Sequence, residues 1–112
     1  MELAVEVMGP GAKLPEEMEQ HLLRIAHEAV TNALKHAGAS RIGVKLHLEE
    51  RQIHLRISDN GRGFDRQDVF SSRAGHFGVI GMRERAERLG GGLRLTSNPG
   101  EGTEVEVTVP LP

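Results

Sequence analysis

The segment QIHLRISDNGRGF (52–64) passes from an alternating apolar and polar run into an acid, an amide and two glycines. Ile53, Leu55 and Ile57 share one side of this run, which predicts a strand with one buried face. A hairpin turn needs only Asn-Gly, so the acid before it and the second glycine need another explanation. An acid at a strand end can accept a hydrogen bond from an exocyclic amine, and Gly-x-Gly lets backbone come close to a flat ring.

The sequence on both sides of this segment predicts a sheet covered by helices. A helical pattern runs from Pro15 to Ala37 with Gly38 as its stop, and a second one covers 79–90. Further strands are expected at 2–7, 41–49, 91–98 and 103–109, with turns at 49–52 and 99–102. Because the strands are polar on one face, we expect a largely antiparallel sheet with one solvated side. The predicted fold class is α/β (α+β), a two-layer sandwich with helices on the other side.

Length and composition limit the classes of protein that are possible. The chain has 112 residues and no cysteine, which indicates a single domain, 1–112, without a disulfide scaffold or a thiolate site. The net charge is −2, and tyrosine and tryptophan are absent, so a nucleic-acid surface is not expected. No apolar run has the length of a membrane helix, and no signal peptide is evident. We therefore expect no direct insertion into a membrane.

The helical segment HEAVTNALKHA (27–37) places three polar side chains along one edge of its apolar arc. Glu28 and Asn32 are four residues apart, and Lys35 lies on the same flank. An amide oxygen is a suitable ligand for magnesium, and a lysine offers positive charge to phosphate oxygens. A solvated helix face with a Glu–Lys contact explains these residues equally well, so the segment by itself leaves both interpretations open.

The segment GHFGVIGMRERA (75–86) places Gly75, Gly78 and Gly81 before and at the start of the second helix. A glycine-rich entry into a helix leaves backbone N–H groups free to bind an anion. The spacing is not that of the dinucleotide fingerprint, and the lysine of a Walker loop is absent. Residues 60–78 form a long loop for so small a domain, and loops of this length are usually lids or binding elements, or else disordered.

Together, HEAVTNALKHA, DNGRGF, GHFGVIGMRERAERLGG and GEGTEVEVTVPLP occur in an order that resembles the ATP-binding catalytic domain of a sensor histidine kinase. The resemblance covers essentially the whole chain. It is strongest to the nitrate-sensor and desaturase-sensor subfamily of two-component kinases, within the gyrase–Hsp90–histidine kinase–MutL superfamily. It implies the Bergerat fold and a transferase that binds Mg-ATP and passes the γ-phosphate to a histidine in signal transduction.

By this resemblance, the first helix carries the catalytic and metal-binding residues. Asn32 would hold magnesium, Glu28 would act as general base, and Lys35 would reach the phosphates. His36 would lie against the nucleotide.

The same resemblance assigns the remaining residues to the base and to a mobile segment over the phosphates. Asp59 would accept from the adenine amino group, with Gly61 and Gly63 closing the loop on the base, and Thr103 would support adenine from the last strands. The segment 60–80, and 65–77 above all, would be the ATP lid, with Gly78 and Gly81 on its phosphate side.

Two features depart from the family pattern. His76 and Phe77 stand where many relatives begin the lid motif with glycine. The dimerisation and phosphoacceptor helices are absent, so the acceptor histidine would lie on a separate domain of the parent kinase, which in turn serves a response regulator. His27 imitates an acceptor by its neighbours HEAVTN, but it lies within the nucleotide motif and we reject it as the acceptor. His21, His47 and His54 are expected to be solvated surface.

Two alternative functions remain open from the sequence. One is a related serine kinase of anti-sigma type, and the other is a nucleotide-gated interaction module without catalysis. The expected location is the cytoplasm, with the membrane attachment of the parent kinase left open.

Overall fold

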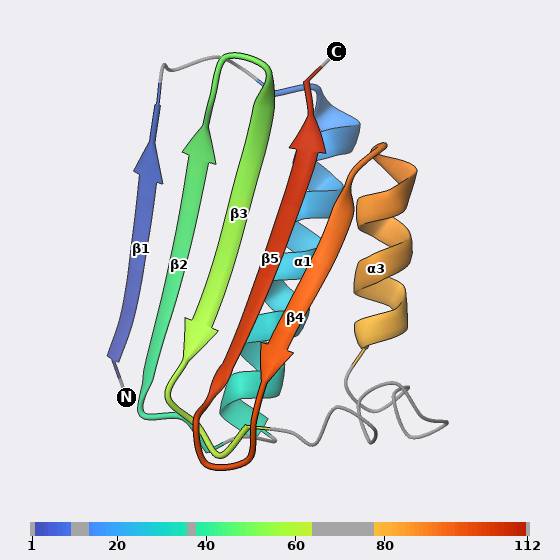
Figure 1. Ribbon diagram of the computed structural model, residues 1–112. Coiled ribbons are helices and arrows are strands. Elements are labelled where there is room, and N and C mark those ends of the chain that lie inside the picture. The colour runs from blue at the N-terminus through green and yellow to red at the C-terminus, as the bar shows by residue number, and fades with distance from the viewer. Residues whose placement is uncertain (1, 10–13, 36–37, 64–77, 112) are drawn as a thin grey trace.

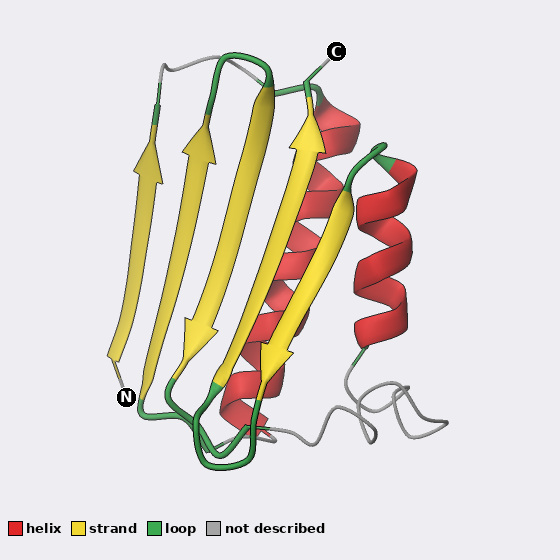
Figure 2. Ribbon diagram, viewed as in Figure 1, coloured by secondary structure: helices red, strands yellow, loops and turns green. Residues whose placement is uncertain are grey.

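The computed structural model describes residues 2–9, 14–35, 38–63 and 78–111, which form a sheet with helices against one face (Figure 1). The two layers are plain in Figure 2, and the predicted two-layer sandwich is confirmed. The elements in chain order are β1 (Glu2–Met8), α1 (Glu16–Lys35), β2 (Arg41–Leu48), β3 (Gln52–Asp59), α3 (Val79–Arg88), β4 (Gly92–Ser97) and β5 (Thr103–Pro110). Neither described helix is long and apolar enough to cross a membrane.

The five strands lie in the order β1-β2-β3-β5-β4. Among the described strands, β1 and β2 are parallel and the other three pairings are antiparallel, as the alternating pattern predicts. The register places Asp59, the last residue of β3, directly opposite Thr103, the first residue of β5. Residues 44 positions apart in the chain therefore meet at one end of the sheet.

The core fills the space between α1, α3 and strands β2 to β5. Ile53, Leu55 and Ile57 of β3 are buried as predicted. Of the residues expected to face inward from α3, Val79, Met82 and Ala86 are buried, whereas Leu89 is only partly buried. The helical wheel of α1 predicts an apolar arc, of which Leu22, Ala29 and Ala33 are buried. Ala26 and Val30 are only partly buried, and Ala37 lies outside the described residues. The wheel missed three buried positions of α1, which are Met18, Ile25 and Asn32.

The first helix begins where the sequence indicates, and its predicted end at Ala37 lies outside the described residues. It starts at Glu16, directly after Pro15, a residue suited to a helix start. After the last helical residue, Lys35, the N–H of Ala39 donates to the carbonyl of Ala33 at 3.0 Å. This bond turns the chain back against the final turn of α1, so the start of β2 is held close to Asn32.

Strand β1 departs from the prediction that helices cover the apolar side of the sheet. Its apolar residues Leu3, Val5 and Val7 are 51%, 65% and 64% exposed. The reason is the placement of the helices, because α1 packs on β2 and β3 while α3 packs on β4 and β5. Figure 1 shows β1 at the left edge of the sheet, away from both helices. Among the described residues, no helix covers this strand.

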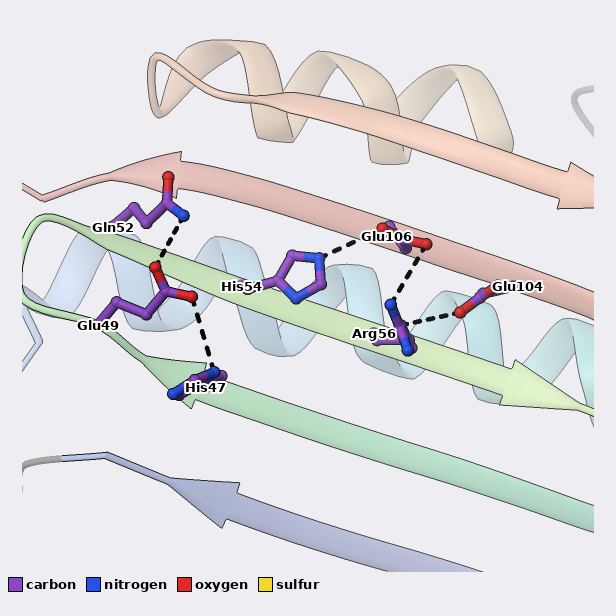
Figure 3. A network of polar contacts seen from close by, with 7 residues as sticks. All are labelled: His47, Glu49, Gln52, His54, Arg56, Glu104 and Glu106. Atoms are coloured by element: carbon purple, nitrogen blue, oxygen red, sulfur yellow. Dashed lines mark hydrogen bonds and ion pairs between the residues drawn. The ribbon is translucent and has the colours of Figure 1, made fainter.

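The opposite face of the sheet carries paired charges (Figure 3). Arg56 of β3 pairs with Glu104 at 2.8 Å and with Glu106 at 3.6 Å, and His54 lies 3.3 Å from Glu106. His47 and His54 both lie on this polar face as predicted. His47 is exposed, whereas the side chain of His54 is 27% exposed and lies beside Glu106. Half-exposed ion pairs contribute little stability, so this network matters less than the core on the other face.

Candidate functional site

A narrow cavity opens between the sheet and the two helices at the end where β3 finishes and β5 begins. Its walls are largely apolar, and three polar side chains enter it: Asn32, Asp59 and Thr103. The apolar lining comes from both layers, namely Ala29, Ile57, Val79, Met82, Leu95 and Val105. Apolar walls with a few polar groups are typical of small-molecule sites. The cavity has a volume of about 10 Å³, so it must widen to admit a flat organic ring.

A wider groove of about 830 Å³ runs between β1 and the outer side of α1. Leu3, Val5 and Leu23 line it, together with polar residues of the helix surfaces such as Arg24 and His27. None of these polar side chains is buried. The narrow cavity is the better candidate site, because it has polar groups fixed by their surroundings.

The surroundings of Asp59 shift the pKa of its carboxyl. Burial raises the pKa of its carboxyl above the ordinary value of 3.8, against the opposing effect of hydrogen bonds from the backbone of Gly61 and Thr103. The N–H of Gly61 donates to Oδ1 at 2.8 Å. This bond fixes the side-chain rotamer on Oδ1. A carboxylate has about four acceptor lone pairs, so Asp59 keeps acceptor capacity for a ligand in the cavity.

The second glycine of DNGRGF has a packing role that the sequence did not reveal. At Gly63 φ is +71°, and a Cβ would lie 2.1 Å from the carbonyl oxygen of Asn98. Gly102 is similar, with φ of +82° and a Cβ position 2.2 Å from the carbonyl oxygen of Asp59. The loop after β3 and the β4–β5 hairpin therefore touch backbone to backbone. The contact therefore requires glycine at position 63.

Ser97 is a buried site residue that the sequence analysis missed. Its Oγ donates to the carbonyl of Gly102 at 3.2 Å and lies 2.8 Å from Oγ1 of Thr103. Since the hydrogen of Ser97 is directed to Gly102, the Thr103 hydroxyl is the donor between the two and keeps its acceptor lone pairs. The only sequence signal was a serine at an inward position of β4.

The three polar residues of α1 differ in their surroundings. Asn32 is 7% exposed and faces the cavity. Glu28 is half-buried, and a Cβ at Gly78 would lie 2.7 Å from its Oε2, so this carboxylate packs against the start of α3. Lys35 is exposed in the last turn. Of the predicted set, the structure brings Asn32 together with Asp59 and Thr103.

The start of α3 leaves backbone donors without a helical acceptor. Gly78 is the N-cap residue with φ of +63°, and no side chain of the described chain caps the helix. The first intrahelical bond runs from the N–H of Met82 to the carbonyl of Gly78, so the N–H groups before Met82 are available to an anion. Gly81 is exposed in this first turn.

The other predicted residues either fall outside the described residues or lie away from the narrow cavity. His36, Gly75, His76, Phe77 and the proposed lid core 65–77 are outside the described residues. His21 is not free surface as predicted, because its ring contacts Arg85 at 3.3 Å and Glu17 at 3.9 Å. His27 is exposed on α1.

Residues 17–112 match the family described as histidine kinase-, DNA gyrase B- and HSP90-like ATPases. The chain belongs to this family. Among solved structures, the chain resembles the blue-light activated histidine kinase of Erythrobacter litoralis, with a TM-score of 0.73 and 28% identity. That likeness covers 97% of this chain and 35% of the solved chain, and it agrees with the predicted Bergerat fold.

Curated relatives of this ATPase-family chain are sensor kinases. The chain is 36% identical over 104 residues to the signal transduction histidine-protein kinase/phosphatase DegS of Brevibacillus brevis, which is 93% of this chain and 26% of DegS. It is 39% identical over 94 residues to the sensor histidine kinase LiaS of Bacillus subtilis, which is 84% of this chain and 25% of LiaS. The chain thus spans about a quarter of the length of these relatives.

Proposed function

We propose that this chain is the ATP-binding catalytic domain of a sensor histidine kinase and that the narrow cavity binds adenine. The observation that carries the proposal is the position of Asp59 beside Thr103, half-buried at the end of an apolar cavity, with one carboxylate oxygen free of the bond from Gly61. An exocyclic amine could donate to both Asp59 and Thr103, since each presents an acceptor. Gly61 and Gly63 shape the loop that holds Asp59.

The phosphates would extend from the base toward Asn32 and the start of α3. Asn32 fits a magnesium ligand, because its amide is held at the cavity and magnesium commonly takes one or two protein oxygens plus phosphates and water. Magnesium would neutralise phosphate charge when bound. The N–H groups in the first turn of α3, which have no helical acceptor, would offer further positive potential together with Lys35.

In the transfer step, a nitrogen of the acceptor imidazole attacks the γ-phosphorus, the bond to the β–γ bridging oxygen breaks and ADP leaves. The chain contributes positioning and charge neutralisation, which dominate phosphoryl transfer. Glu28 lies beside the start of α3 and would accept the proton that the imidazole loses. The acceptor belongs to the dimerisation and phosphotransfer domain of the parent kinase, in the cytoplasm, and a response regulator receives the phosphoryl group from it.

The experiment adds labelled ATP, a separate phosphoacceptor domain and a candidate regulator to the purified chain. The kinase proposal requires an acid-labile, alkali-stable phosphohistidine on the acceptor. Phosphoserine on the regulator would instead identify a serine kinase of anti-sigma type. Nucleotide binding without either product would identify a nucleotide-gated interaction module. The relatives favour the first outcome, because they are named as histidine kinases.

Adenosine binding should weaken as the pH falls. The ionised carboxylate of Asp59 is the acceptor, and burial raises its pKa, so the loss begins at a higher pH than for an ordinary aspartate. Calorimetry with adenosine between about pH 7 and about pH 4.5 measures this, and adenosine avoids the phosphate group that titrates near pH 6. An affinity independent of pH over this range would argue against Asp59 as the acceptor.

The change Asn32→Ala should remove the benefit of magnesium while leaving the base site in place. In the wild type, ADP should bind more tightly with magnesium than with a chelator, and in the variant the two affinities should agree within about twofold. Asn32→Asp, which keeps an oxygen ligand, should retain the magnesium effect and serves as the control. An undiminished magnesium effect in Asn32→Ala would exclude this residue as the ligand.

A further inference from the structure

Asn60 links two parts of the site that are distant in the chain. Its Oδ1 accepts hydrogen bonds from the N–H groups of Ser40 at 3.0 Å and Arg41 at 2.9 Å. Its Nδ2 donates to Oγ of Ser40 at 2.9 Å, and its own N–H donates to the carbonyl of Arg41 at 3.2 Å. The exposed Asn60 therefore makes four hydrogen bonds to Ser40 and Arg41, where β2 begins.

The segment held by Asn60 is directly connected to the polar end of α1. Ala39, which precedes Ser40, donates its N–H to the carbonyl of Ala33 at 3.0 Å. Asn32 and Lys35 belong to the same final turns of the helix. Asn60 itself follows Asp59, so a short series of bonds joins the acid at the end of β3 to the end of α1.

We propose that Asn60 is a positioning residue that sets the distance between the base end and the phosphate end of the nucleotide site. The inference rests on the proposed function, in which Asp59 meets the base and Asn32 and Lys35 meet the phosphates. When the distance between the two ends is fixed, one nucleotide can contact both ends at the same time. Little binding free energy is then lost in ordering the two ends of the site. Without Asn60, each end keeps its own groups but the spacing between them is no longer fixed.

The test compares the affinities of adenosine and of ADP with magnesium, measured by calorimetry. Adenosine reports the base end alone, whereas the ratio of the two affinities reports how well both ends work together. In Asn60→Ala we expect this ratio to fall about 10-fold, the effect of losing two or three hydrogen bonds, while adenosine binding changes less than about threefold. A residue that only stabilises the fold would not change the ratio.

Three further variants serve as controls for Asn60→Ala. Ser40→Ala removes one of the four bonds and should keep the ratio within about threefold of the wild type. Asn98→Ala, an exposed asparagine at the same end of the sheet, should leave it unchanged. If Asn60→Ala does not fold, Asn60→Gln sets the same amide one methylene further away and should lower the ratio likewise.

Equal weakening of adenosine and ADP in Asn60→Ala, or no weakening of either, would overturn the positioning role. These results differ from a failure of the proposed function itself, in which the wild-type chain would bind neither ligand.

Discussion

Replacing Asp59 by asparagine should weaken the binding of ADP by about 100-fold, or about 3 kcal/mol. The N–H of Gly61 already occupies Oδ1, and in Asp59→Asn it would hold the single amide oxygen in the same way. The amide NH₂ would then face the exocyclic amine of the base, so that donor meets donor and the hydrogen bond is lost. Calorimetric titration of wild type and variant with ADP and magnesium measures the difference.

The same substitution should not destabilise the ligand-free domain. Burial raises the pKa of Asp59 above its value in the unfolded chain, so the folded state binds the proton more tightly. Stability therefore falls as the pH rises from the unfolded to the folded pKa, and at neutral pH the buried charge opposes folding. A neutral asparagine removes this cost, and we expect an unchanged or higher Tm.

A matched control for this experiment is Glu101→Gln, which makes the same charge change at an exposed position of the β4–β5 hairpin. It should bind ADP as the wild type does. Asp59→Asn with undiminished ADP affinity would contradict the assignment of Asp59. A variant that loses affinity together with a large loss of Tm would show that the acid is needed for the fold and not for the base.

The substitution Gly102→Ala should cost about 4 kcal/mol of unfolding free energy. Its Cβ would lie 2.2 Å from the carbonyl oxygen of Asp59, a backbone atom that cannot move without shifting β3 against β5. The positive φ of +82° adds strain for any residue with a side chain. Urea unfolding gives the free energy, and ADP binding should fall as well because Asp59 is displaced.

Gly100 separates the two contributions, since its φ of +81° matches that of Gly102 but no atom lies within 4 Å of its Cβ position. Gly100→Ala should therefore cost only the backbone strain, about 1 kcal/mol. Similar losses in the two variants would show that backbone conformation, and not the contact with Asp59, limits the residue at position 102.

Periodicity predicted the local elements of the fold well. The alternation of Ile53, Leu55 and Ile57 places β3, and Pro15 marks the start of α1. The spacing of apolar residues does not show which other helix or strand packs on a given element. It could not show that Leu3 and Val5 stay exposed, because that depends on how far the helix layer extends across the sheet.

The candidate site was predictable where motif residues touch the cavity directly, as Asn32, Asp59 and Thr103 do. Residues that act through neighbours gave weaker signals. Ser97 is one inward serine in a strand, and only the register of β4 against β5 brings it to Thr103. The bond pattern of Asn60 depends on a contact between segments about 20 residues apart, which no local pattern encodes.

The most direct test of the central claim is to locate ADP on the domain by two-dimensional ¹H–¹⁵N NMR, with and without magnesium. If the narrow cavity binds adenine, the largest shift changes should occur at the backbone amides of Gly61, Asn32 and Thr103 around it. The amides of Leu3 and Val5 in the wide groove should keep their positions. Largest changes in that groove, or binding without changes around Asp59, would show that the nucleotide does not bind at the narrow cavity.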